Sequence, residues 1–222
     1  MFHTVLGLVC LALVSTPDAA TVVCALSTST AILVGMGKMR RPLADAERIA
    51  ATIVTDLAPV CTRIQVAGSV RRCKEMVGDI EVVAIPRYEP AGLFGDRTTN
   101  TLWTHLHAND AYRFLKGDNP DGRYYQLALS TDDDLQVDLF LAQPDNWGLT
   151  LLVRTGSAAF STSILARWKR AQGIGREQPG SVDGRLVDRA GQVVPTPEED
   201  TVFALVGMRP VDPTRRRGPD EQ

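Results

Sequence analysis

Two acidic side chains, Asp79 and Glu81, lie one residue apart in the stretch Gly-Asp-Ile-Glu-Val-Val-Ala. Successive side chains of an extended strand point to opposite faces, so both carboxylates would project from the same face. The apolar residues Ile80, Val82 and Ala84 would occupy the other face, toward a core. Two carboxylates at this separation can bind a divalent cation through oxygen, the donor atom that Mg²⁺ prefers.

A Gly-Ser turn and a basic pair precede these acids, at Gly68-Ser69 and Arg71-Arg72. The backbone N–H groups of such a turn can bind a phosphate, and a guanidinium group can neutralise its charge. The acidic pair alone is equally consistent with an ordinary strand that carries two exposed acids. The ordered combination of turn, basic pair and acidic pair indicates a site for a phosphate and a metal ion.

A third acid is expected downstream, because a site for two metal ions needs more than two carboxylates. The stretch 135–141 alternates apolar and other residues, which leaves Asp138 on the face opposite a buried stripe. An acid in the middle of such a strand is costly unless a cation or partner compensates it. Asp134 shares that face but would lie about 13 Å from Asp138 at roughly 3.3 Å per residue. We therefore interpret residues 132–134, three consecutive aspartates, as a solvated hairpin turn.

This ordered pattern resembles the nucleotidyltransferase superfamily, and specifically the family X DNA polymerases, which are DNA polymerase beta-like nucleotidyltransferases. The resemblance to the superfamily depends on the Gly-Ser turn and the acids. The resemblance to family X depends on Thr155-Gly156-Ser157, which is similar to that family's entry into the thumb, and on residues 197–205, which resemble its terminal thumb helix. The similarity extends over roughly residues 43–213.

The resemblance implies an α+β fold in the minimal palm-plus-thumb form found in viral members of the family. A nucleotidyltransferase palm, a mixed sheet with helices packed on one face, would span residues 39–143. A small α+β thumb would follow at residues 144–209, and residues 210–222 would form a disordered tail. Residues 1–38 would be a leader, either a weak signal peptide or the product of a start codon upstream of the true start at Met36 or Met39; we favour the second.

The resemblance also implies the chemistry. Asp79, Glu81 and Asp138 would bind two Mg²⁺ ions, for which Mn²⁺ can substitute, and Asp138 would accept the proton of the attacking hydroxyl. The reaction would be nucleotidyl transfer from a (deoxy)nucleoside triphosphate to a 3′-hydroxyl of DNA, in short-gap-filling repair synthesis.

The family's nucleotide contacts fall on further residues of this chain. Gly68, Ser69, Arg72 and Gly78 would contact the triphosphate, and Thr155-Gly156-Ser157 would lie against the sugar. The expected partners are a nucleoside triphosphate and primer–template or gapped DNA. We expect a monomer without membrane attachment, located in the cytoplasm, or in the host cytoplasm if the protein is viral.

Three departures from the family keep two other functions open. Glu81 stands where the family usually has Asp, and Val153 and Arg154 replace an aromatic pair. Ser161 and Thr162 replace an Asn and a base-stacking Lys, which weakens the case for templated selection. The alternatives are a template-independent nucleotidyltransferase acting on RNA, a small molecule or a protein, and a catalytically inactive nucleic-acid-binding module. All three carboxylates are present, which argues against the inactive module.

Composition limits the partners. The chain has 222 residues, 44% of them hydrophobic, and a net charge of −2, so it can bury a core but lacks the basic balance of a strong nucleic-acid binder. Contacts with phosphates would be few and sensitive to salt. The four cysteines show no Cys-x-x-Cys spacing, and we take the thiols as reduced. His105-Leu106-His107 is placed in a loop rather than in a metal site.

The remaining elements are predicted from periodicity and turn residues. Helices are expected from Leu43 to Leu57 and along the stripe formed by Phe160, Ile164 and Trp168. Strands are expected at 63–67, as a hairpin at 112–115 and 124–129, and as a pair at 186–188 and 192–194. Residues 86–110 are expected to be irregular. Residues 196–199, Thr-Pro-Glu-Glu, predict a capping box with Pro at the first helical position.

Overall fold

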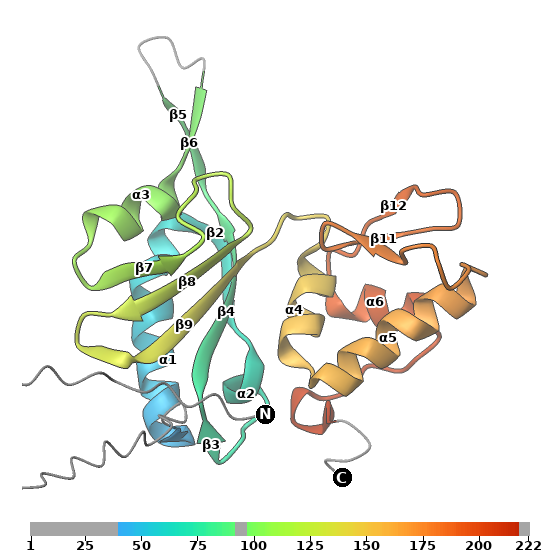
Figure 1. Cartoon of the computed structure of the whole chain (residues 1–222), viewed down its shortest axis with the longest axis horizontal. Coiled ribbons are helices and arrows are strands. Elements are labelled where there is room, and N and C mark those ends of the chain that lie inside the picture. The colour runs from blue at the N-terminus through green and yellow to red at the C-terminus, as the bar shows by residue number, and fades with distance from the viewer. Residues whose placement is uncertain (1–39, 92–96, 218–222) are drawn as a thin grey trace, which may run out of the picture. The chain divides into compact units, whose positions relative to one another are not determined.

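The computed structural model describes residues 40–91 and 97–217 (Figure 1), so the predicted leader lies outside the described residues. Within the described ranges, no helix is both long enough and apolar enough to cross a membrane.

A mixed sheet forms the centre of the N-terminal half. In the described part of the chain its five strands run in the order β2 (Cys61–Val66), β4 (Asp79–Pro86), β9 (Asp132–Leu141), β8 (Tyr124–Leu129) and β7 (Tyr112–Lys116). The pair β4 and β9 is parallel, and the other neighbouring pairs are antiparallel. The predicted hairpin of β7 and β8 is therefore confirmed, and so is the α+β class.

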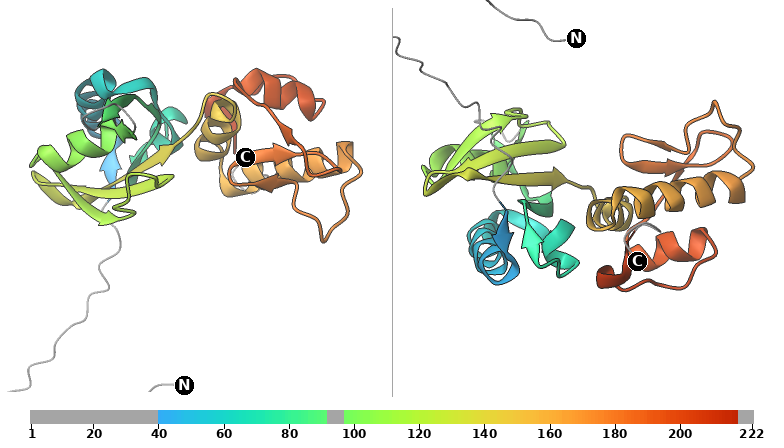
Figure 2. Two further views of the ribbon diagram at one scale, coloured as in Figure 1. Left: turned by 90° about the horizontal axis from the view of Figure 1, so that it is seen from above. Right: turned by 60° about the horizontal axis from the view of Figure 1, so that its bottom comes forward.

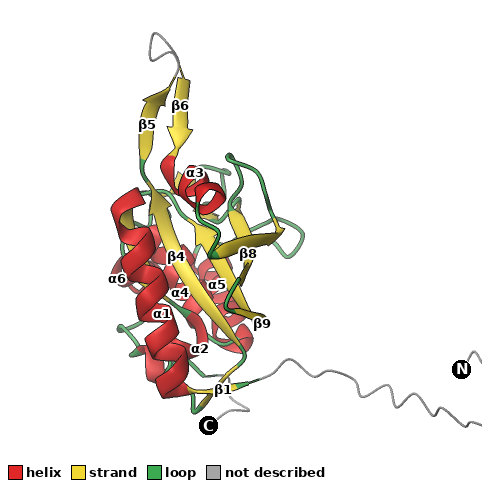
Figure 3. Cartoon of the chain, turned by 90° about the vertical axis from the view of Figure 1, so that its left-hand side faces the viewer, coloured by secondary structure: helices red, strands yellow, loops and turns green. Residues whose placement is uncertain are grey.

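Helices α1 (Leu43–Leu57) and α3 (Thr101–Ala108) pack on one face of this sheet, as Figure 3 shows for α1 and β4. The predicted helical stripe of α1 is buried there with Leu102 and Leu106 of α3. Alternate residues of the central strands, including Ile80 and Val82 of β4 and Val137 of β9, complete this core. The alternation of apolar residues thus fixes which face of β4 and β9 remains for polar side chains.

The other face of the sheet is covered in part by α4 (Trp147–Thr155). Trp147 and Leu151 of α4 pack against Val83, Ile85 and Phe140 in a second apolar cluster. Because α4 lies beyond residue 143, this contact does not bear on the expectation that the helices of residues 39–143 pack on one face; it forms because β4 is apolar on both faces beyond Glu81. The polar end of this face, where Asp79 and Glu81 lie, borders the cluster.

The C-terminal elements, yellow to red in Figure 2, form a group. This group has its own apolar core. It comprises α4, α5 (Ala158–Ala171), β10 (Ser181–Val182), β11 (Arg185–Val187), β12 (Val193–Val194) and α6 (Glu199–Leu205). The predicted stripe of Phe160, Ile164 and Trp168 on α5 is buried against Val202 and Phe203 of α6. The predicted pairing of β11 with β12 is also confirmed.

Shorter elements complete the described chain. They are η1 (Ala58–Val60), α2 (Gly68–Arg71), the antiparallel pair β1 (Arg41–Pro42) and β3 (Met76–Val77), the antiparallel pair β5 (Tyr88–Ala91) and β6 (Arg97–Asn100), and η2 (Pro213–Arg215).

Three predictions in the N-terminal half are wrong. Residues 86–110 are not irregular, because they contain β5, β6 and α3. His105 and His107 lie on α3 rather than in a loop, and their rings contact Asp56 and Asp118 at 3.1 and 2.7 Å. Strand β9 begins at Asp132, so residues 132–134 belong to a strand and not to the turn.

Two predictions near the C-terminus are also wrong. The predicted capping box does not form: α6 begins at Glu199, and the hydroxyl of Thr196 is buried without a hydrogen bond to any described residue. The expected disordered tail is ordered over residues 210–217, where η2 forms and the side chain of Arg216 is buried. Residues 218–222 lie outside the described residues.

Candidate active site

The sheet register brings the predicted carboxylates together. Strands β4 and β9 pair in parallel with Glu81 opposite Asp138 and Asp79 opposite Gln136. Partners in register point to the same face, and the apolar core fixes that face as the one turned away from α1 and α3. Each of the three acids thus projects from one face of two adjacent strands.

The environment of Glu81 shows how strongly negative charge accumulates at this place. Burial and the nearby carboxylates of Asp79 and Asp138 together raise the pKa of Glu81 to about 7, against the opposite effect of Arg72 and Arg154. Near neutral pH this carboxyl group therefore carries a proton for part of the time. A bound cation would relieve the same repulsion.

Asp138 is held by three donors on one oxygen atom. Tyr124 Oη donates to Asp138 Oδ1 at 2.8 Å, Gln136 Nε2 at 2.7 Å and Gln126 Nε2 at 3.3 Å. Burial raises the pKa of Tyr124 to about 12, and its hydrogen bond to Asp138 acts in the same direction, so the phenol remains a donor at neutral pH. The second oxygen, Oδ2, takes none of these three bonds.

The donor set fits magnesium in its chemistry. Carboxylate oxygens are the ligands that Mg²⁺ prefers, and three of them share one face of the sheet. In the described ranges, however, no three His, Cys, Asp or Glu side chains converge closely enough to hold a metal ion as they stand. Convergence on an ion would therefore require side-chain rotation of these acids.

The Gly-Ser turn lies directly against Glu81. Gly68 begins α2 with φ of +61°, a conformation that disfavours a side chain, and a Cβ atom there would lie 1.9 Å from Glu81 Oε2. The N–H of Ala67 donates to the carbonyl of Glu81 at 2.8 Å, which ties the turn to β4. Ser69 Oγ is buried without a hydrogen bond to any described residue. The remaining glycine of the prediction, Gly78, is half-buried directly before β4.

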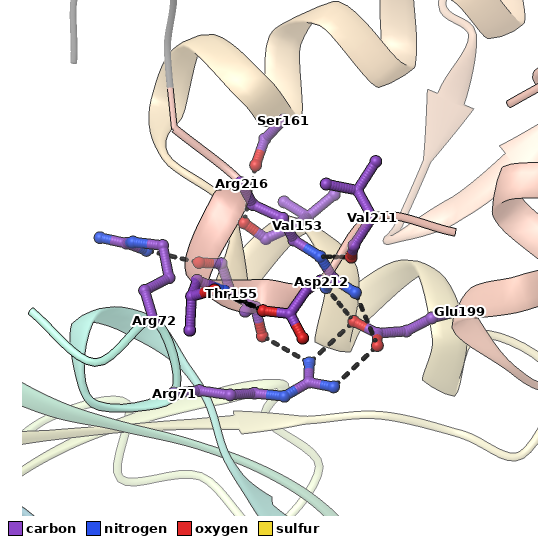
Figure 4. Close-up of polar contacts among 10 residues, drawn as sticks. Arg71, Arg72, Val153, Thr155, Ser161, Glu199, Val211, Asp212 and Arg216 are labelled. Carbon is purple, nitrogen blue, oxygen red and sulfur yellow. Dashed lines mark hydrogen bonds and ion pairs between the residues drawn. The ribbon is translucent and has the colours of Figure 1, made fainter. Parts of the chain in front are cut away.

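Arg71 at the end of α2 and Arg72 directly after it contact the C-terminal group of elements (Figure 4). Arg71 donates from both terminal nitrogens to Glu199 at 2.8 Å, and from Nη1 also to Thr155 Oγ1 at 2.8 Å. Arg216 pairs with the same carboxylate from the other side, with Nη2 at 3.1 Å from Glu199 Oε2. Arg72 donates from Nη1 to the carbonyl of Thr155, and its Nε is buried without a partner among the described residues.

Thr155, Gly156 and Ser157 form the junction between α4 and α5. The side chain of Thr155 accepts from Arg71, and Ser157 Oγ accepts from the N–H of Phe160 at 3.2 Å as the N-cap of α5. Thr155 and Ser157 are buried. In this state their hydroxyl groups serve the junction, and the expected contact with a sugar stays a prediction.

A pocket of about 780 Å³ opens beside the carboxylates. Its lining includes Glu81 and Asp138 together with Tyr124, Phe140 and Arg154. The predicted phosphate-binding residues of the turn are not part of its described lining. Glu81 thus lies between two different surroundings, the turn at Gly68 on one side and this pocket on the other.

The prediction missed two residues of the site, Tyr124 and Arg154. The sequence holds a signal for each: Tyr124 and Gln126 alternate on the strand that pairs with Asp138, and Arg154 directly precedes the Thr-Gly-Ser junction. Neither signal specifies a contact until the register of β8 on β9 is known.

A scan against models of known protein families matches none of them, and a search of curated proteins finds no match to this chain.

Proposed function

We propose that this protein transfers a nucleotidyl group from a (deoxy)nucleoside triphosphate to the 3′-hydroxyl of DNA, as family X DNA polymerases do, in short-gap-filling repair synthesis. The observation that carries the proposal is the pairing of Glu81 with Asp138 on parallel strands, with the glycine of the Gly-Ser turn against the Glu81 carboxylate. A phosphate-binding turn beside paired carboxylates is the arrangement that this reaction needs.

In this proposal Asp79, Glu81 and Asp138 hold two Mg²⁺ ions. When bound, such ions lower the pKa of an attacking hydroxyl and neutralise the charge on a leaving pyrophosphate. Asp138 receives the proton of the hydroxyl, whose oxygen bonds to the α-phosphorus as the bond to pyrophosphate breaks. Its Oδ2, which takes none of the three bonds described above, is available for that proton.

The triphosphate would bind at the start of α2. Two buried polar atoms, Ser69 Oγ in α2 and Arg72 Nε directly after it, have no hydrogen bond to any described residue. A buried polar group without a partner is costly, and phosphate oxygens would satisfy both atoms.

A second pocket supports a polyanionic partner in spite of the net charge of −2. It measures about 500 Å³ and includes Arg40, Lys74 and Arg217 against one acid, Glu75. Three cations gathered in one place can attract a nucleic-acid backbone even when the whole chain is slightly acidic.

One observation favours a second candidate, a template-independent nucleotidyltransferase. Ser161 stands where family X has an Asn, yet it is 8% exposed and its hydroxyl donates to the carbonyl of Val153 at 2.9 Å. A side chain used in this way does not select a base.

Extension of a one-nucleotide gap separates the two candidates. Each dNTP is supplied singly on the four possible template bases, with Asp45→Asn on the exposed surface of α1 as a control variant. Incorporation that follows the template supports the polymerase, whereas incorporation that ignores it supports the second candidate. Failure to extend DNA, RNA or small-molecule acceptors would contradict both.

A further inference from the structure

We propose that Tyr124 is a positioning residue for Asp138, and that Arg154 of α4 holds Tyr124 in place through the ring of Phe140. The inference rests on the proposed function, because it concerns how one of the proposed metal ligands is oriented. It assigns roles to residues outside the ligand set and links that set to α4.

The hydrogen bonds around Asp138 are directional. All three donors meet at Oδ1, and Gln126 Nε2 also donates to Tyr124 Oη at 2.9 Å, so the phenol and the amide brace each other. A carboxylate fixed through one oxygen has one remaining oxygen to offer. Oδ1 is thus committed to the protein, and Oδ2 becomes the atom that meets a cation or a proton.

The ring of Tyr124 is held by stacking on a ring of the neighbouring strand. Tyr124 lies opposite Phe140 in the antiparallel register of β8 and β9, and the two rings stack with centroids 5.1 Å apart and an interplanar angle of 27°. The guanidinium of Arg154 lies 3.9 Å from the centroid of the Phe140 ring. Phe140 is 8% exposed and Tyr124 is half-buried, whereas Arg154 is exposed, so only the middle ring of the stack is buried.

This stack connects two parts of the site. Arg154 belongs to α4, one residue before the junction that Arg71 and Arg72 contact, whereas Asp138 belongs to the central sheet. A shift of α4 would move the guanidinium over Phe140 and loosen the ring beneath it. The orientation of Asp138 therefore depends on the position of α4.

A purely packing role for these rings predicts a loss of stability alone. A positioning role predicts a selective loss of metal binding, because partners in the outer shell of a ligand typically change metal affinity by roughly ten- to a hundredfold. Tyr124→Phe separates the two roles, because it removes the hydroxyl group and leaves the ring in place.

The experiment measures binding of Mn²⁺ alone to the full chain by electron paramagnetic resonance, with the melting temperature recorded for each variant. Tyr124→Phe should weaken Mn²⁺ binding roughly tenfold or more and reduce turnover while KM for the nucleoside triphosphate stays within about twofold. The matched control is Tyr125→Phe, whose hydroxyl accepts from Asn100 on the other face of the sheet. It should lose stability and keep its Mn²⁺ affinity.

A second pair of variants tests the stack without touching the phenol. Arg154→Met should weaken Mn²⁺ binding in spite of removing a positive charge, and Arg154→Lys should restore part of the loss. The matched control is Arg63→Met, which removes a guanidinium 4.3 Å from the ring of Trp147. If Tyr124→Phe does not fold, the Mn²⁺ affinities of Arg154→Met and Arg154→Lys alone decide whether the stack positions Asp138.

The outcomes are distinguishable. Binding of Mn²⁺ to the wild type that Asp138→Asn abolishes, together with unchanged affinity in Tyr124→Phe and Arg154→Met, would overturn this inference and leave the proposed function standing. A folded wild type that binds no Mn²⁺ would overturn the proposed function, and the inference with it.

Discussion

At the scale of single residues, Glu81 is the most constrained group of the candidate site. Its carboxylate lies against Gly68, is close to the charges of Asp79 on the same strand and Asp138 on β9, and lines the pocket on the other side. The neighbouring acids and the burial both oppose its ionisation. The cation that we propose to bind there would be a functional reason for keeping an acid in such surroundings.

Gly68→Ala should reduce Mn²⁺ affinity and activity, because an added Cβ would meet both the carboxylate and the Cβ of Glu81. The left-handed backbone also costs stability, on the order of 1 kcal/mol. Gly173→Ala is the matched control: its φ of +62° is nearly the same, and nothing lies within 4 Å of the added atom. Equal losses of metal affinity in the two variants would contradict the close approach of Gly68 to Glu81.

Glu81→Gln should stabilise the metal-free protein at pH 8 and leave it unchanged at pH 4. The pKa of Glu81 rises from its ordinary 4.5 to about 7 on folding, so folding opposes ionisation of this group. The resulting penalty is absent below pH 4.5, grows as the pH rises from there, and is complete above pH 7, at about 3 kcal/mol or less. Urea unfolding at both pH values measures it, and an equal effect at pH 4 and pH 8 would rule it out.

At the scale of elements, the contact between α2 and α6 is built on charge. Glu199, whose side chain is 14% exposed, receives Arg71 from one side and Arg216 from the other. Burial alone would raise the pKa of Glu199, but the hydrogen bonds from Arg71 and Arg216 outweigh it, and the pKa lies below the ordinary value of 4.5. These paired charges connect the elements that follow β9 to the turn at the candidate site.

Glu199→Gln should therefore destabilise the protein by about 3 kcal/mol at pH 7, because it leaves two largely buried guanidinium groups without their counter-ion. A lowered pKa contributes stability above pH 4.5 that is lost as the pH falls through the folded value, so the difference from wild type should shrink in acid. Glu198→Gln is the control, since its ion pair with Arg63 is exposed and should contribute about 1 kcal/mol or less. Equal losses in both variants would contradict the buried role of Glu199.

Elements with strong periodicity were predictable from sequence, and those fixed by tertiary contacts were not. The alternation along β4 and β9 and the stripe on α5 each bury a continuous apolar face. Helix α3 has only Leu102 and Leu106 buried, too few to mark a period, and it is started by Asn100 accepting from the N–H of Trp103.

The start of α6 shows the same limit. Its sequence favours a cap at Thr196, but the N–H of Gly148 donates to the carbonyl of Thr196 at 2.7 Å, and the N–H of Thr196 donates to Asp145. Glu198 is held extended with φ of −134°, and its side chain pairs with Arg63. Contacts with residues about fifty and more than a hundred positions away thus move the helix start to Glu199, beyond what a local pattern can predict.

The candidate site, too, has features that the sequence predicts and features that depend on tertiary contacts. The face shared by Asp79 and Glu81 follows from their spacing, and the strand of Asp138 follows from its alternation. The opposition of Glu81 to Asp138 depends on a parallel register between segments that are far apart in sequence. The contacts of Tyr124 and Arg154 depend instead on the antiparallel register of β8 on β9, which is why neither could be predicted.

At the scale of the whole molecule, charge is distributed unevenly. The net charge is −2, yet three basic side chains, Arg40, Lys74 and Arg217, line one pocket. The carboxylates of the candidate site lie together on one face of the sheet. A protein of this kind would bind nucleic acid through few phosphates, so its activity should be measured at low salt.

Mg²⁺-dependent release of pyrophosphate on one-nucleotide-gapped DNA tests most directly whether Asp79, Glu81 and Asp138 carry out nucleotidyl transfer, as we propose. The wild type and the surface control Asp45→Asn should release pyrophosphate as the primer lengthens by one nucleotide. Asp138→Asn should fold with an equal or higher melting temperature without metal, because a repelling charge is lost, and should release none. Asp138→Asn turning over at the wild-type rate would contradict the account.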